Sequence, residues 1–132
     1  MRTEAPVDPL DTRRFFEEKA RKRELELDRL FQAANTDARK IISMLEKDYA
    51  PERIWQWGSL LDRTRFSKIS DIDIAVEGIR DTSTFFELYG RALELTTFSL
   101  DLVELERIEP LHAESIRTGG RLVFERSHAA HR

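Results

Sequence analysis

In the first third of the chain, apolar residues recur mostly at spacings of three, four or seven positions, which places them on one face of a helix. They are Phe16, Ala20, Leu27, Leu30, Phe31, Ala34, Ala38, Ile41, Ile42 and Leu45. The pattern predicts a helical segment over residues 11–49, capped by Asp11 or Thr12. It forms one long helix or two stacked helices that meet at 35–37, and we favour one. Such a helix is longer than a small domain is wide, so part of it should project.

After Pro51, the pattern changes to the alternation of polar and apolar residues that is typical of strands, interrupted by two shorter helical stretches. We expect a cap at Thr82 or Ser83 for the first of these helices, and an end at Gly119-Gly120 for the second. The sequence thus predicts a mixed α/β fold with a long N-terminal helix. The expected strands cover 53–57, 71–77, 98–105 and 121–125, and the expected helices cover 85–95 and 110–116.

The length of 132 residues favours a single domain. Within it we distinguish a flexible lead-in, a helical segment, a core and a tail, at 1–10, 11–49, 50–126 and 127–132.

The composition limits the possible classes of function and partner but does not identify the function. Hydrophobic residues make up 40% of the chain and charged residues 36%, as in a globular protein with a highly charged surface. The net charge of −3 argues against general attraction to nucleic acid or to an anionic membrane. The chain has no cysteine, and no apolar run is long enough to span a bilayer, so we expect a cytoplasmic protein.

Asp71 and Asp73 lie two residues apart in a predicted strand, so their side chains point to the same face. Carboxylates this close repel each other unless a cation lies between them. Magnesium prefers one or two carboxylates together with phosphate oxygens and water, which a nucleoside triphosphate can complete. The pair therefore predicts a magnesium site. The alternative is a solvated strand face, which is the commoner meaning of this pattern taken alone.

Asp101 lies in another strand of similar alternation. If that strand pairs beside the strand of Asp71 and Asp73, a third carboxylate reaches the same patch. There Asp101 can complete a two-metal site or act as the base that activates an acceptor.

Gly58-Ser59 falls at the end of the first predicted strand. Glycine lets a phosphate approach the backbone, and serine offers a hydroxyl and an N–H. Basic side chains follow in the next loop, and the first of them, Arg63, can neutralise outer phosphates.

The order of these signals closely resembles that of the MNT family of minimal nucleotidyltransferases, in the DNA polymerase beta-like superfamily: Gly58-Ser59, then Ser70-Asp71-Ile72-Asp73-Ile74, then Asp101. The resemblance covers about residues 53–125. It implies the nucleotidyltransferase fold, a small mixed β-sheet flanked by helices. It also implies one or two Mg²⁺ ions on Asp71 and Asp73, with Asp101 as the third carboxylate. The nucleotide-binding residues are then Gly58, Ser59 and, from the basic loop, Arg63.

Many small members of that family are antitoxins paired with an all-helical HEPN ribonuclease toxin, and some adenylylate a tyrosine of the toxin. The resemblance thus implies transfer of AMP from ATP to a hydroxyl of a HEPN-type toxin, with no nucleic acid or membrane as a direct partner. Homo-oligomerisation stays open. The alternative is a catalytically weak antitoxin that neutralises its toxin by binding alone. Two departures concern the loop of Arg63, which is one residue longer than in many members and carries Thr64 where a glycine is common.

Overall fold

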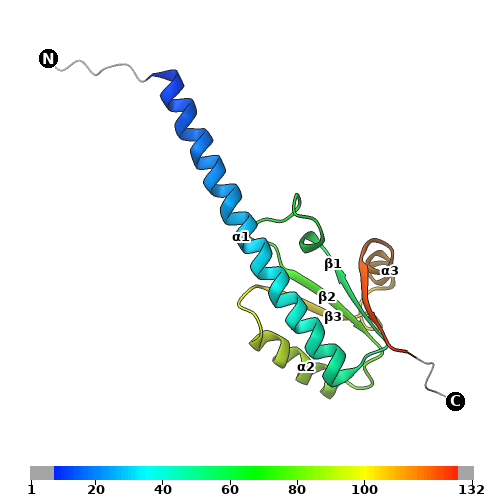
Figure 1. Cartoon of the computed structure of the whole chain (residues 1–132). Helices are drawn as coiled ribbons and strands as arrows, with labels where there is room; N and C mark the ends of the chain where they lie inside the picture. Colours follow the sequence, from blue (N-terminus) through cyan, green and yellow to red (C-terminus); the bar gives the residue numbers. More distant parts are fainter. Residues whose placement is uncertain (1–7, 128–132) are drawn as a thin grey trace.

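The computed structural model describes residues 8–127 (Figure 1). The rest of the predicted lead-in and tail, 1–7 and 128–132, lies outside the described residues. The elements follow in the order α1 (Pro9–Tyr49), β1 (Arg53–Trp57), a short 3-10 helix (Ser59–Leu61), β2 (Ile72–Glu77), α2 (Thr82–Glu94), β3 (Leu100–Glu104), α3 (Pro110–Gly119) and β4 (Arg121–Glu125).

The strands form one mixed sheet in the order β3-β2-β1-β4. β1 runs antiparallel to both β2 and β4, whereas β2 and β3 are parallel. Parallel neighbours need a crossover connection, and α2 provides it. The mixed sheet flanked by helices, preceded by a long helix, confirms the predicted fold class.

The alternation along the strands divides the core between the two faces of the sheet. On one face, α1 and α2 pack against residues such as Ile72 and Ile74. On the other face, Ala75 packs with Ile116 of α3. Asp73 lies between Ile72 and Ile74 in β2, so it faces the side of α3. The predicted site therefore lies on the side of the sheet away from the long helix.

The helix α1 is continuous, which confirms the prediction of one helix rather than two. The polar stretch at 35–37 does not interrupt it, and within the helix Asn35 and Thr36 each donate a side-chain hydrogen bond of 3.0 Å to the carbonyl four residues earlier. Figure 1 shows the N-terminal half extending beyond the sheet, as expected. No helix within residues 8–127 combines the length and the apolar character needed to cross a membrane. The buried residues of α1 all lie in its C-terminal half: Ala34, Ala38, Ile41 and Leu45.

The start of α1 corrects the prediction. It begins at Pro9, inside the predicted lead-in, because Asp8 is the cap in place of Asp11 or Thr12. The Asp8 carboxylate accepts a hydrogen bond of 2.9 Å from the amide of Leu10. Proline suits the first helical position, because its missing N–H would have no helical partner there.

The start of α2 also differs, since Asp81 caps it instead of Thr82 or Ser83. Its carboxylate accepts a hydrogen bond of 2.7 Å from the amide of Thr84. A carboxylate forms a stronger, charge-assisted bond at this position than a hydroxyl does. The same hydrogen bond lowers the pKa of Asp81.

Leu45 tests how much the fold depends on α1, because its side chain is fully buried, at 0% exposure. We expect Leu45→Ala to lower the free energy of unfolding by about 3 kcal/mol, since it leaves a cavity between helix and sheet. Leu111→Ala is the matched control, because Leu111 is 75% exposed on α3 and should cost less than about 0.5 kcal/mol. Urea unfolding followed by circular dichroism measures both, and equal losses would contradict this account of the core.

Candidate functional site

The pairing of β2 with β3 brings the predicted carboxylates together. Asp73 lies directly opposite Asp101 in the parallel register, so the two side chains share a face of the sheet. Asp71 precedes β2 by one residue and lies two positions from Asp73, on that same face. The structure therefore contains the strand pairing on which the placement of Asp101 depended.

The three carboxylates lie close to one another without a basic partner. Within residues 8–127, none of them takes part in an ion pair or a side-chain hydrogen bond. Burial, with added repulsion from Asp101 and Asp71, raises the pKa of Asp73 to about 7. Asp71 and Asp101 are exposed, so the patch is open to a ligand. A cation bound here would relieve the repulsion.

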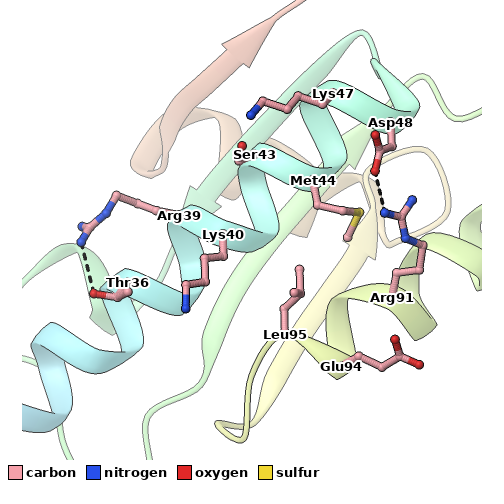
Figure 2. A pocket seen from close by; sticks show the side chains of 10 residues that line it. All are labelled: Thr36, Arg39, Lys40, Ser43, Met44, Lys47, Asp48, Arg91, Glu94 and Leu95. Atoms are coloured by element: carbon pink, nitrogen blue, oxygen red, sulfur yellow. Dashed lines mark hydrogen bonds and ion pairs between the residues drawn. The ribbon is translucent and has the colours of Figure 1, made fainter.

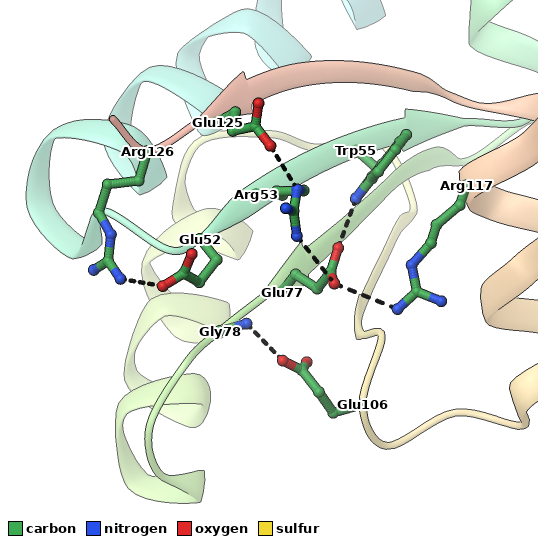
Figure 3. Close-up of polar contacts among 9 residues, drawn as sticks. All are labelled: Glu52, Arg53, Trp55, Glu77, Gly78, Glu106, Arg117, Glu125 and Arg126. Carbon is green, nitrogen blue, oxygen red and sulfur yellow. Dashed lines mark hydrogen bonds and ion pairs between the residues drawn. The ribbon is translucent and has the colours of Figure 1, made fainter. Parts of the chain in front are cut away.

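Glu77 is a carboxylate that neighbouring side chains neutralise. It lies on the same face at the far end of β2, where Figure 3 shows it among basic groups. Trp55 Nε1 donates to it over 3.0 Å, and Arg53 and Arg117 pair with it at 3.6 and 3.4 Å. One strand face thus carries a neutralised carboxylate at one end and unneutralised carboxylates at the other.

The carboxylates fit a metal that is held jointly with a ligand. Among the described residues, no group of three or more histidine, cysteine or carboxylate side chains is placed to hold a metal ion by itself, so Asp71, Asp73 and Asp101 do not form a complete protein-only site. Magnesium instead takes one or two carboxylates and completes its shell with water and phosphate oxygens. Asp71 and Asp73 offer such oxygens, and Asp101 adds a third negative charge beside them. The donor set therefore fits magnesium with a phosphorylated ligand.

Gly58 lies against this patch at the end of β1. Its neighbour Trp57 pairs with Asp73, and a side chain built on Gly58 would place its Cβ 2.0 Å from Asp73 Oδ2. Its φ of +84° also lies in the region that favours glycine. Ser59 follows as the first residue of the 3-10 helix. The structure thus brings the predicted Gly58-Ser59 signal beside the aspartates.

The side chain of Arg63 is bound by two acidic residues of α1. Its Nε donates to Asp28 Oδ1 over 2.6 Å, and its Nη2 donates to Glu24 Oε2 over 3.0 Å. In the same loop, the buried ring of Phe66 packs edge-on against Phe31, with 5.3 Å between centroids. The loop between Ser59 and Asp71 is therefore fastened to α1. A contact between Arg63 and a nucleotide stays a prediction.

A groove of about 640 Å³ lies between α1 and α2, on the opposite face of the sheet (Figure 2). Arg39, Lys40 and Lys47 of α1 line it together with Arg91 of α2, which pairs with Asp48 at 2.6 Å. None of the predicted site residues lines this groove, so it is separate from the aspartate patch. The sequence did not suggest it, because two helices distant in the chain form it.

Comparison with known proteins identifies relatives of this fold. Residues 39–129 match a family model described as Polymerase beta, Nucleotidyltransferase. A crystal structure of a toxin-antitoxin, MntA-HepT, is 23% identical, with a TM-score of 0.52 over 69% of this chain and 72% of that one. A crystal structure of a toxin-antitoxin with AMP-PNP is 26% identical, with a TM-score of 0.53 over 65% of this chain and 72% of that one. No curated protein matches the chain.

The contact between Gly58 and Asp73 leads to a prediction about stability. Gly58→Ala should lower the free energy of unfolding by about 2 kcal/mol or more, because alanine is strained at positive φ and its Cβ displaces the Asp73 carboxylate. Gly90→Ala in α2 is the control. No atom lies within 4 Å of its added Cβ, so it should gain up to about 1 kcal/mol of helix propensity. Thermal melts of both variants measure the difference, and a neutral Gly58→Ala would contradict the close approach.

The raised pKa of Asp73 predicts how stability depends on pH in metal-free protein. Because the folded-state pKa of about 7 exceeds the value of about 3.9 in unfolded chains, Asp73 favours folding most at acidic pH. Its contribution falls as the pH rises from about 4 to about 7. At pH 8, Asp73→Asn should therefore be more stable than wild type, by about 1–2 kcal/mol after allowance for solvent screening at this half-buried site.

The control for this prediction is Glu77→Gln on the same strand face. It should destabilise the protein at pH 8, because it removes the carboxylate that pairs with Arg53 and Arg117. Urea unfolding at pH 4.5 and pH 8 separates the two effects. A loss of stability in Asp73→Asn at pH 8 would contradict the raised pKa of Asp73.

Proposed function

The chain belongs to the polymerase beta nucleotidyltransferase family, and from this membership we propose that it transfers AMP from ATP to a hydroxyl of a HEPN-type toxin protein, with magnesium bound at Asp71 and Asp73. The observation that carries the proposal is the patch of three carboxylates that the fold leaves without a basic partner among residues 8–127. On the same strand face, two arginines neutralise Glu77, whereas the carboxylates at the other end stay unneutralised and can bind a cation.

The positions of the residues support the following proposed roles. The acceptor oxygen attacks the α-phosphorus of ATP in line, the bond from phosphorus to the bridging oxygen breaks, and pyrophosphate leaves. Asp101 accepts the proton of the attacking hydroxyl, and the backbone at Gly58 and Ser59 holds the triphosphate. Asp71 and Asp73 hold magnesium, which when bound neutralises charge on the α-phosphate and the leaving group.

The nucleotide and the partner are supported by the comparison at 26% identity. That structure is described as a toxin-antitoxin with AMP-PNP, an analogue of ATP. The donor set of this chain suits a triphosphate with magnesium, as argued above. A toxin with an exposed hydroxyl is then the acceptor, which makes this chain the antitoxin of the pair.

A second candidate is neutralisation of the toxin by binding alone, and the placement of Arg63 favours it. The guanidinium that was predicted to meet outer phosphates is already paired with Asp28 and Glu24. Under this alternative the aspartates contribute nothing to neutralisation, and the two candidates predict different results for the same variant.

The variant Asp71→Asn/Asp73→Asn separates them. We expect it to lower AMP transfer by about 1,000-fold or more, because it removes both metal carboxylates. The assay incubates the protein with labelled ATP, magnesium and the toxin encoded by the adjacent gene, and finds the added nucleotide by mass spectrometry. Glu94→Gln is the control, because Glu94 is an exposed acid of α2 on the opposite face of the sheet and should leave the rate unchanged.

Growth of cells that express the toxin completes this test. If transfer is the mechanism, the double variant fails to protect them although it remains folded by circular dichroism. Full protection by a variant that transfers no AMP would establish neutralisation by binding alone and reject the proposed reaction.

A further inference from the structure

The projecting part of α1, residues 9–23, carries large apolar side chains in contact with solvent. Phe15 and Phe16 are 61% and 59% exposed, and Leu10 is 67% exposed. By helical spacing, Phe16 and Ala20 continue the face that packs on the sheet further along α1. The apolar face of α1 therefore extends past the end of the sheet that covers it.

A helix of this kind needs a covering surface. Helices in proteins gain most of their stability by packing an amphipathic face, and residues 9–23 contribute no buried residue to such packing. Two neighbouring exposed phenylalanines place apolar surface in water, and burying it against a partner would be favourable. The expected cover is a groove that accepts one face of a helix.

The charge of the segment indicates the chemistry of that groove. Between residues 13 and 23 the chain has six basic side chains and two acidic ones, a local net charge of +4 in a chain whose total is −3. A partner surface that complements it carries aspartate and glutamate around an apolar centre. The basic residues are Arg13, Arg14, Lys19, Arg21, Lys22 and Arg23, and the acidic ones are Glu17 and Glu18.

The same helix of a second copy suits this segment poorly. Glu24, Glu26 and Asp28, the acids that follow it on α1, could neutralise a neighbouring copy only if they were free. Arg63 holds Glu24 at 3.0 Å and Asp28 at 2.6 Å, while Arg29 holds Glu26 at 2.6 Å. Pairing two such helices would therefore bring like charges together, which disfavours association.

We propose that residues 9–23 of α1 dock as a helix into an apolar groove rimmed by acidic residues on the toxin. This inference rests on the proposed function, because it names the surface that holds the proposed acceptor. Phe16 lies on the apolar face and is the main anchor, and the ring of Phe15 contacts it edge-on, with 5.5 Å between centroids, so the two rings form one apolar unit. The surrounding lysines and arginines meet the acidic rim.

The position of the docking helix relative to the aspartates supports the proposal. The loop that joins Ser59 to Asp71 is fastened by Arg63 to Glu24 and Asp28, immediately after the projecting segment. Figure 1 shows this loop beside the middle of α1, where the helix leaves the sheet. A toxin held along residues 9–23 would thus lie at the end of the domain that carries Gly58 and the aspartates.

The decisive variant is Phe15→Ser/Phe16→Ser in the full chain. We expect it to weaken binding to the toxin encoded by the adjacent gene by about 100-fold or more in calorimetry, since buried aromatic anchors dominate such interfaces. Phe86→Ser is the matched control, because Phe86 of α2 is 67% exposed and should change affinity by less than about 2-fold. Both changes are at exposed positions, and equal melting temperatures confirm that the variants fold.

Charge gives a second readout. Lys19→Glu/Lys22→Glu should weaken binding by about 10-fold or more at low salt, and the loss should shrink as salt is added, because screening removes the repulsion. An affinity that is unchanged in this variant would contradict the acidic rim.

The outcomes separate this inference from the proposed function. Asp71→Asn/Asp73→Asn should bind the toxin with wild-type affinity while losing transfer, and Phe15→Ser/Phe16→Ser should still bind ATP with magnesium. Wild-type toxin affinity in the phenylalanine variant, or an equal loss in Phe86→Ser, overturns the docking surface and leaves the reaction standing. A wild-type homodimer that the phenylalanine variant splits assigns the surface to a second copy and also overturns it. Normal docking without transfer rejects only the reaction.

Discussion

The crowding of like charges at Asp71, Asp73 and Asp101 is the constraint on which the rest of the site depends. It follows from the in-register parallel pairing of β2 and β3, which sets Asp73 against Asp101 while Ile72 and Ile74 secure the strand from the opposite face. The fold makes room for the half-buried Asp73 carboxylate by placing a glycine beside it at Gly58. Burial, with added repulsion from Asp101 and Asp71, raises the pKa of Asp73, and a bound cation would relieve that repulsion.

The long helix α1 contributes differently along its length. Its C-terminal half is buried against the sheet, and its middle fastens the loop between β1 and β2 through Phe31 and through the acids that hold Arg63. Its N-terminal half extends into solvent. The element that stabilises the core thus also fixes the loop that follows Gly58-Ser59. This continuity places the proposed docking surface directly beside the contacts that Arg63 makes with Glu24 and Asp28.

The sequence predicted those features that depend on local periodicity. Helical spacing identified α1 as a single helix, and alternation with period two placed Asp71 and Asp73 on one face. The partner of Asp101 could not be derived from periodicity, because parallel pairing joins residues far apart in the chain. The ion pair between Arg63 and Asp28 could not be predicted from the sequence either. The same local sequence allows a basic loop residue to bind a phosphate or to pair with a carboxylate that is distant in the chain.

The two acidic ends of β2 show that such a site is best recognised by carboxylates that the fold leaves without a neutralising partner. A carboxylate can be stabilised within the chain, as Glu77 is by Arg53 and Arg117, or left for a ligand to stabilise. Asp73 belongs to the second group and is less stable in its charged form than an ordinary aspartate, which costs the free protein stability near neutral pH. Proteins tolerate such local inconsistencies mainly where function requires them. Unneutralised acids packed against a glycine therefore indicate a ligand site more strongly than the Asp-x-Asp pattern alone, because a solvated strand face would need neither the burial of Asp73 nor the close approach of Gly58.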